Sequence, residues 1–244
     1  IDAQAVINLS AGLSWAAYSK NKLSFTPVLN ADFEDYIEKE KDHSFSLFIA
    51  TALNYSLGEN SNFGLTPNYV HQRVDDEKLM DLLGGSASLS HDAEFAKITF
   101  STNFQSFLPS DKYKDVLAGN SFGFSLGAEK LIGKSQIAVK LKWDKADLKS
   151  DALKSTTIGF ESSLFYPVND RLSFEPFINY VSKDSSEIKK VDSEFQIGSS
   201  LSWSLNDWLK LLGEVEIILG NAEVENESES FQRYLITTGA SAEF

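Results

Sequence analysis

Residues 231–244 read FQRYLITTGASAEF, and alternate residues of this stretch differ in polarity. One side carries Tyr234, Ile236, Thr238, Ala240, Ala242 and Phe244. The other side carries Arg233, Leu235, Thr237, Gly239, Ser241 and Glu243. Because successive side chains of a β-strand point to opposite faces, this alternation predicts a strand with one apolar face. That face continues to the final residue, which is aromatic.

Two kinds of connection alternate along the rest of the chain. Short polar turns are centred near residues 21, 60, 92, 132, 169 and 206. Longer charged segments lie between them, namely Asp35–His43, Asp75–Met80, Pro109–Asp115, Asp147–Asp151, Lys183–Lys190 and Glu223–Ser230. One turn and one charged segment recur roughly every 38 residues, a length that suits a hairpin of long strands. The chain is therefore predicted to be all-β and antiparallel.

The segments between these connections also alternate in polarity. Around residue 124, for example, apolar and small polar side chains take turns in the run Ser121, Phe122, Gly123, Phe124, Ser125, Leu126. The predicted strands are about 12 to 15 residues long, whereas strands of soluble sheets usually have about 5 or 6. A tilted membrane strand needs about 9 to 11 residues, to which an overhang is added. The lengths therefore favour a transmembrane barrel over a soluble β-sandwich.

The terminal aromatic residue and the plan of hairpins resemble the β-barrels of the Gram-negative outer membrane, which commonly end in Phe after alternating apolar residues. The resemblance implies a single domain, residues 1–244, folded as a closed antiparallel transmembrane β-barrel. It implies short periplasmic turns and longer charged extracellular loops. It also implies that the outer-membrane assembly machinery recognises the last strand, through Tyr234 and Phe244. No signature of a specific porin family is matched.

Composition agrees with such a protein. The 244 residues include no Cys, and the mean hydropathy of −0.20 looks soluble because the lumen side of each barrel strand is polar. The net charge of −13 argues against nucleic acid as a partner. The first residues, IDAQAVINLS, lack a basic region followed by an apolar one. We therefore expect the mature form of a bacterial outer-membrane protein, without its signal peptide.

The number of strands poses a parity problem. Counting back from Phe244 gives thirteen alternating segments, whereas single-chain bacterial barrels normally have an even number. Two interpretations give twelve strands: residues 20–43 form one long loop after the first strand, or residues 1–18 form a plug in the lumen or lie outside the wall. A third keeps all thirteen and adds an upstream strand, which gives fourteen. We expect twelve, with fourteen as the alternative, and leave the topology of residues 1–40 open.

Aromatic residues gather near the predicted strand ends. The members of this predicted interfacial girdle are Tyr18, Trp143, Tyr166, Trp203 and Trp208. Tyr and Trp favour the boundary between membrane and water because one end of each side chain is apolar and the other polar.

Charged residues fall on the predicted lumen side of the later strands. A mid-height belt of mixed sign is expected from Lys140, Lys142, Glu161, Glu175, Glu214 and Glu216, with Arg233 in the outer lumen. Charges in a membrane protein must face water or one another. The belt is either an ion-pair network that closes the lumen or a constriction that selects solutes.

The sequence offers no enzyme constellation. Of the three histidines, His43 lies in a predicted loop, His71 on the lipid side near the outer rim, and His91 in a turn. None is in register with a nucleophilic Ser and a carboxylate. The acidic tract Glu223–Glu229 lacks the pattern of a calcium loop. We therefore expect no catalytic residue, no metal site and no cofactor.

The predicted function is a channel for passive passage of small hydrophilic solutes. The alternatives are a closed structural or adhesive barrel whose acidic loops bind a partner, and a transporter of hydrophobic substrates, for which Phe48, Phe177 and Leu212 argue. The expected partners are the lipid bilayer and lipopolysaccharide, the assembly machinery, and the solutes.

Overall fold

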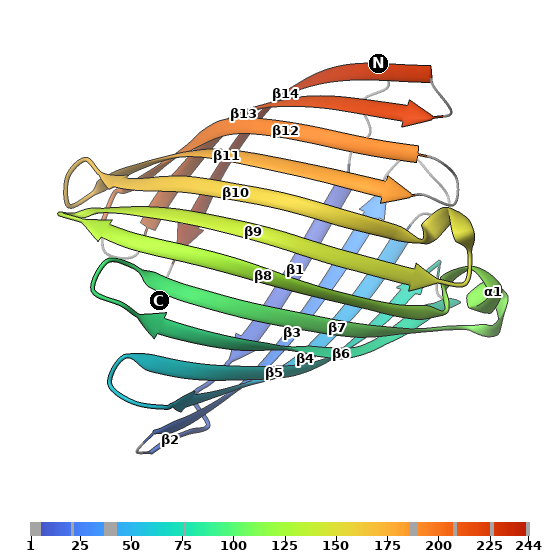
Figure 1. Cartoon of the computed structure of the whole chain (residues 1–244), viewed down its shortest axis with the longest axis horizontal. Helices are drawn as coiled ribbons and strands as arrows, with labels where there is room; N and C mark the ends of the chain where they lie inside the picture. The colour runs from blue at the N-terminus through green and yellow to red at the C-terminus, as the bar shows by residue number, and fades with distance from the viewer. Residues whose placement is uncertain are drawn as a thin grey trace. The chain divides into compact units, whose positions relative to one another are not determined.

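A computed structural model describes residues 6–20, 22–36, 43–75, 77–185, 190–206, 209–224 and 227–242 (Figure 1). Its strands are β1 (Val6–Ser14), β2 (Tyr18–Lys20), β3 (Leu23–Tyr36), β4 (His43–Ser56), β5 (Ser61–Val74), β6 (Glu77–Asp92), β7 (Lys97–Pro109), β8 (Gly119–Ile132), β9 (Ser135–Leu148), β10 (Ser155–Pro167), β11 (Leu172–Ser185), β12 (Lys190–Ser204), β13 (Leu209–Val224) and β14 (Glu227–Ala242). Three short helical turns lie in the connections: η1 (Asp111–Tyr113), α1 (Lys114–Leu117) and η2 (Asp151–Leu153). No helix among the described residues is long and apolar enough to cross a membrane.

The strands form one sheet in the order β1-β3-β4-β5-β6-β7-β8-β9-β10-β11-β12-β13-β14, and β2 pairs with β3. This confirms the prediction of an all-β antiparallel fold. The thirteen strands of the path correspond to the thirteen alternating segments of the sequence. In the described residues no ladder joins β14 to β1.

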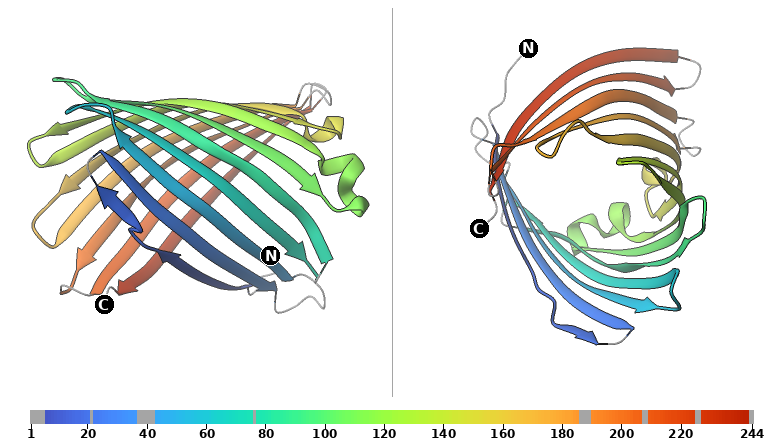
Figure 2. Two further views of the ribbon diagram at one scale, coloured as in Figure 1. Left: turned by 90° about the horizontal axis from the view of Figure 1, so that it is seen from below. Right: turned by 90° about the vertical axis from the view of Figure 1, so that its left-hand side faces the viewer.

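The two twelve-strand interpretations of the N-terminal region differ from the structure. Residues 23–36 are a strand, not a loop, because β3 pairs with β1 on one side and with β4 on the other. Residues 6–14 are likewise part of the sheet, not a plug. Ser14 pairs with Val28 and Tyr18 with Phe25, so β1 and β2 line the same edge of β3 and are separated by a one-residue bulge. Figure 2 shows β2 beside the start of β3.

The short turns have local causes. Asn169 Oδ1 accepts hydrogen bonds from the backbone N–H groups of Arg171 and Leu172, and Asn206 Oδ1 accepts one from Leu209. Gly133, with φ 62, supplies the left-handed conformation that the two-residue turn between β8 and β9 requires. These turns lie where the sequence predicts them.

Several predicted charged loops are shorter than expected. β6 begins at Glu77, so most of Asp75–Met80 is strand, and β14 begins at Glu227, within the predicted loop 223–230. By contrast, the connections after β7 and β9 do contain loops, with α1 and η2 in them. Charged side chains do not end a strand by themselves; the ladder continues wherever both backbones remain in register, and the charges are hydrated beyond the apolar region.

The chain divides into two compact units, which are described separately. Unit 1 comprises residues 1–91, 101–124 and 145–154; unit 2 comprises residues 92–100, 125–144 and 155–244. In unit 2, strands β10 to β14 lie side by side in consecutive antiparallel pairs (Figure 1). In unit 1, β3, β4, β5 and β6 do the same.

The two faces of the sheet differ in both units. On one, termed the apolar face, large hydrophobic side chains are exposed, for example Ile49, Leu83 and Ile178. The opposite face, termed the mixed face, carries small polar, charged and some apolar residues. The buried apolar residues of the described chain are few, namely Ala50, Val70, Leu82, Leu148 and Ile218. A soluble protein would bury its apolar face in a second layer, so this sheet requires an apolar environment on that side.

Three prolines interrupt the ladders at equivalent places. Pro27 and Pro176 are each the fifth residue of their strand, in β3 and β11, and Pro67 is the seventh residue of β5. Each pairs continuously with the following strand. Toward the preceding strand, regular pairing stops opposite residues 15–17, 51–52 and 164–165. Proline has no N–H to donate, which explains why the break falls on the same side each time.

Candidate functional site

The charged belt predicted for the later strands lies on the mixed face of unit 2. Registers place Glu161, Asn179, Gln196, Ile218 and Arg233 in one row across β10 to β14. Lys142, on the adjacent strand β9, donates from its Nζ to Oε1 of Glu161 in this row. Two residues of the predicted belt are thus joined as an ion pair. The two side chains are 35% and 41% exposed, so water screens the pair.

A second group of bonds crosses the three neighbouring strands. Asn179 Nδ2 donates to Gln196 Oε1 over 2.9 Å, and Gln196 Nε2 donates to Glu216 Oε2. Asn179 and Gln196 are members of the site that sequence reasoning missed, because a neutral amide carries no charge signal. Glu216 is held by a neutral donor and therefore keeps its negative charge unbalanced by this bond.

The remaining belt residues are not brought together by bonds. Glu175 and Glu214 lie on either side of Ser200 in a neighbouring row. Within the described parts of the chain, no hydrogen bond or ion pair is found for these two carboxylates or for Lys140. Within the belt, Lys142 and Glu161 therefore form an ion pair, whereas no such bond joins the described side chains of Lys140, Glu175 and Glu214 to a partner.

Phenylalanines lie over glycines on the same face. Phe177 pairs with Gly198 and Phe231 with Gly220, and a methyl group on either glycine would overlap the ring, at 2.5 Å and 2.0 Å. Arg233 in turn stacks on Phe231, with the guanidinium 4.8 Å from the ring centre, a cation–π arrangement. These contacts fix Arg233, the predicted outer-lumen residue, against the sheet.

The mixed face of unit 1 has a different character. Asn30, Phe48, Val70 and Leu82 form one row across β3 to β6. Val70 and Leu82 are buried, at 9% and 8% exposure. The backbone bonds from Ala93 N to Ala96 O and from Ser110 N to Leu79 O set a register in which Phe107 lies level with Leu82. Sequence reasoning identified only Phe48 here.

Comparisons with known proteins identify the fold. No protein-family model matches the sequence, and no curated protein matches it. Among solved structures, OmpT, an outer membrane protein of Vibrio cholerae, is similar, with a TM-score of 0.56 and 10% identity over 99% of this chain and 98% of that one. An anion-selective porin from Comamonas acidovorans is similar with a TM-score of 0.56 and 12% identity, covering 96% of this chain and 89% of that one.

The chain has the fold of the Gram-negative outer-membrane β-barrels. This agrees with the resemblance seen in the C-terminal strand. At these identities the likeness concerns the fold and does not carry over any residue's role.

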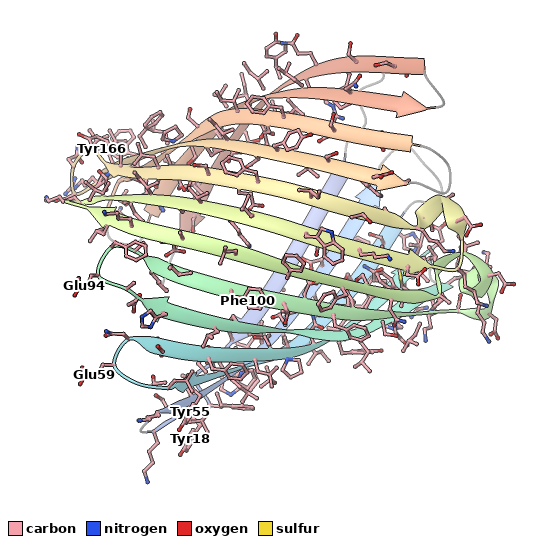
Figure 3. All side chains as sticks on the ribbon, viewed as in Figure 1. Tyr18, Tyr55, Glu59, Glu94, Phe100 and Tyr166 are labelled. Carbon is pink, nitrogen blue, oxygen red and sulfur yellow. The ribbon has the colours of Figure 1, made fainter. Side chains whose placement is uncertain are left out.

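In this fold, aromatic residues border the apolar band. Tyr18, Tyr166 and Trp203 are exposed on the apolar face near the short turns, and Trp143 is half-buried farther along β9. Figure 3 shows Tyr55, which is not among the predicted girdle residues, close to Tyr18 at the same end. Trp208 and Phe244 lie outside the described residues. The last described residues form β14, where Tyr234 is 69% exposed.

The histidines take part in local contacts. His91 Nδ1 lies 2.9 Å from Ser61 Oγ, His43 Nδ1 is 4.0 Å from Asp75, and His71 Nδ1 is 2.7 Å from Asp81 Oδ1. Over the described ranges, no group of three metal-ligating side chains is found.

At the loop end, Lys112 Nζ of η1 donates to Glu77 Oε2 over 2.7 Å. This hydrogen bond raises the pKa of Lys112 above its ordinary value. It ties the connection after β7 to the first residue of β6.

Proposed function

We propose that the protein is a single-domain outer-membrane β-barrel that lets small hydrophilic solutes cross passively. The observation that carries the proposal is the division of β10 to β14 into an apolar face, which suits lipid, and a charged mixed face, which suits a water-filled lumen. On β11 the apolar face runs from Leu172 to Tyr180 through Phe174 and Ile178. That span agrees with the roughly 9 to 11 residues that a tilted strand needs to cross a bilayer.

Closure of the sheet is part of the proposal. In a path of thirteen antiparallel strands, the first and last run in the same direction. Closing the barrel by antiparallel pairs therefore needs one further strand between β1 and β14, which makes fourteen. The alternative is a parallel pair between β1 and β14. A count of twelve would require one of the thirteen strands to leave the sheet.

The proposed mechanism uses the belt as a partial filter. Lys142 and Glu161 neutralise each other, whereas Glu175, Glu214 and Glu216 have no cationic partner among the bonds described above. A solute would exchange its water for these oxygens and for the amides of Asn179 and Gln196. We propose a weak preference for cations, in contrast to the anion-selective porin from Comamonas acidovorans.

Planar-bilayer recordings on the full chain test the channel. We expect discrete conductance steps and a reversal potential of the cation-preferring sign in a KCl gradient. Lys142→Glu should increase the preference and Glu214→Lys should reduce or reverse it. Lys134→Glu, in a short turn outside the belt, is the matched control. A folded, heat-modifiable protein that gives no steps would reject the channel in favour of a closed barrel.

The row containing Phe48, Val70 and Leu82 favours a second candidate, a transporter of hydrophobic substrates. It predicts that long-chain alkyl solutes slow the permeation of ions and that Phe48→Ser weakens this block. We expect neither effect from the hydrophilic channel. The proposed partners are the lipid bilayer, lipopolysaccharide and the outer-membrane assembly machinery. The proposal includes neither catalysis nor nucleic acid binding.

A further inference from the structure

The arrangement of a phenylalanine ring over a glycine occurs twice on the mixed face of unit 2. Phe231 of β14 lies over Gly220 of β13, and Phe177 of β11 lies over Gly198 of β12. In both places only glycine leaves room for the ring, because an added Cβ would lie 2.0 Å from the ring of Phe231 or 2.5 Å from that of Phe177. Each ring is thus held across the neighbouring strand.

The two rings differ in their charged neighbours. The guanidinium group of Arg233 lies 4.8 Å from the centre of the Phe231 ring, so the chain itself supplies a cation there. Among the described side chains, none places a cation over Phe177. A cation is attracted to the face of an aromatic ring because that face carries partial negative charge. The pair of Phe231 and Arg233 therefore shows which kind of partner a ring held in this way accepts.

Three carboxylates lie beside Phe177. Phe177 and Glu216 are the two cross-strand neighbours of Gly198, and Glu216 Cβ lies 3.0 Å from the position that a Cβ of this glycine would take. Glu175 precedes the ring by two residues on β11, and Glu214 lies level with Glu175 on β13. All three carboxylates are half-buried. Their attraction for a cation is therefore stronger than at the open surface.

The charge balance around Phe177 is negative. Across β11, β12 and β13, the four rows from Ser173 to Asn179 hold these three carboxylates and no lysine or arginine. Basic side chains of the mixed face outside these rows are Lys140 and Lys142 of β9, Lys210 of β13 and Arg233 of β14. Lys142 is bonded to Glu161, β10 lies between β9 and β11, and Arg233 stacks on Phe231. Lys210 is four residues from Glu214 along its strand.

Two leucines add apolar surface to the same part of the mixed face. Leu235 of β14 is the cross-strand neighbour of Glu216, and Leu212 precedes Glu214 by two residues on β13. The two leucines are 40% and 42% exposed. Exposed apolar side chains beside carboxylates suit a cation that carries alkyl groups, because apolar contact removes those groups from water and does nothing for a metal ion.

We propose that Phe177, Glu175, Glu214 and Glu216 form a binding site for small organic cations with an alkylated ammonium group. The ammonium group contacts the ring and the carboxylates, and its alkyl groups contact Leu235. Aromatic rings recognise quaternary ammonium groups in this way. The inference rests on the proposed function, since it requires a hydrated mixed face and names a class of solute for it. Binding itself does not require conduction.

Saturation-transfer NMR on the full chain in a nonionic detergent tests the site. The probe is choline, and the control ligand is its neutral isostere, in which carbon replaces the ammonium nitrogen. We expect magnetisation transfer from the protein to the methyl groups of choline and much less to the isostere. Tetramethylammonium should displace choline at concentrations at which potassium does not.

Matched variants separate the ring from its surroundings. Phe177→Leu keeps an apolar side chain but removes the ring, and it should weaken the affinity for choline about two- to fivefold, which corresponds to about 0.5 to 1 kcal/mol. Phe177→Tyr keeps a ring and should retain binding. Glu216→Gln removes one charge and should weaken binding to a similar extent. Phe231→Leu is the matched control, because that ring already has Arg233 as its cation, and it should leave the affinity unchanged.

Three results would overturn the proposal: equal binding of choline and the isostere, unchanged binding by Phe177→Leu, or equal weakening by Phe231→Leu. Displacement by potassium as effective as that by tetramethylammonium would also overturn it, since the carboxylates would then attract any cation. Conductance is measured on the same heat-modifiable samples. A conducting protein that does not bind choline lacks this site, whereas a protein that binds choline without conducting fails only as a channel.

Discussion

The mixed faces of the two units differ in how they use the same strand geometry. In unit 1 the row from Asn30 to Leu82 is largely apolar, and Val70 and Leu82 are buried by their neighbours. In unit 2 the row from Glu161 to Arg233 is polar except for the buried Ile218, and its polar side chains take part in an ion pair and in amide hydrogen bonds. Alternation alone separates the faces in both. The individual residues on a mixed face determine whether that face is packed with apolar side chains or is hydrated.

This difference has an energetic meaning. A buried apolar row is stabilised by contact and tolerates no unpaired charge, whereas a hydrated row tolerates charge but gains little from each ion pair. Stability should therefore depend more on unit 1, and ion selectivity more on unit 2.

The largest expected effect is a charge placed in the packed row. Leu82→Asp should destabilise the protein by about 3 to 5 kcal/mol, because it removes apolar contacts and buries a carboxylate without a partner. The check is the urea midpoint of tryptophan fluorescence in detergent micelles. Ser202→Asp in unit 2, where the cross-strand neighbours Ser173 and Leu212 carry no charge, is the matched control and should shift the midpoint little. If both substitutions cost the same, the mixed face of unit 1 is as hydrated as that of unit 2.

A smaller effect is expected from a methyl group in the same wall. In Gly84→Ala the added carbon would lie 2.3 Å from Phe104 O and 3.0 Å from Gln105 Cα. These neighbours are backbone atoms, which cannot move aside as a side chain can by changing rotamer. We therefore expect the free energy of unfolding to fall by about 1 to 3 kcal/mol, measured in the same assay. Gly213→Ala, where nothing lies within 4 Å, should be neutral. A neutral Gly84→Ala would show that β6 and β7 can separate at this height.

The smallest effect on stability is expected in the charged row. Glu161→Gln leaves Lys142 without its anion, but both side chains are more than a third exposed, so the loss should stay below about 1 kcal/mol. The same substitution should shift the reversal potential toward anions, since it removes a negative charge from the proposed lumen. A stability loss as large as that of Leu82→Asp would mean that the pair is dry and belongs to a closed network.

Much of this architecture follows from alternation in the sequence. The thirteen strands, the short turns at Asn169 and Asn206, and the common face of Lys142 and Glu161 are all set by local pattern, because side-chain direction has a period of two residues. The bulges could not be predicted, since a bulge is a mismatch between two strands. For that reason the contact between Lys78 and Asp81 becomes visible only in the structure.

The row in unit 1 was missed for a related reason. Phe48, Val70 and Leu82 are isolated exceptions within three separate alternating segments, and only the register makes them neighbours. The charged segments led to the opposite error, because parts of strands were predicted to be loops. Residues 77–80 and 227–230 look like loops by composition, yet water hydrates strand ends as readily as loops, and the ladder extends through them.

Pro27, Pro67 and Pro176 give these ladders a built-in point of weakness. Each removes one donor toward the preceding strand, so a carbonyl of that strand loses its usual partner at about the same number of residues from the short turn, although Trp15 and Ala17 still donate to Pro27 and Phe25. Protection of amide hydrogens against exchange should therefore be lowest, within the long strands, around residues 15–17, 51–52 and 164–165. Local opening of the sheet would begin at these three positions. The prolines thus make the strand segments near the short turns more deformable than the rest of these otherwise continuous strands.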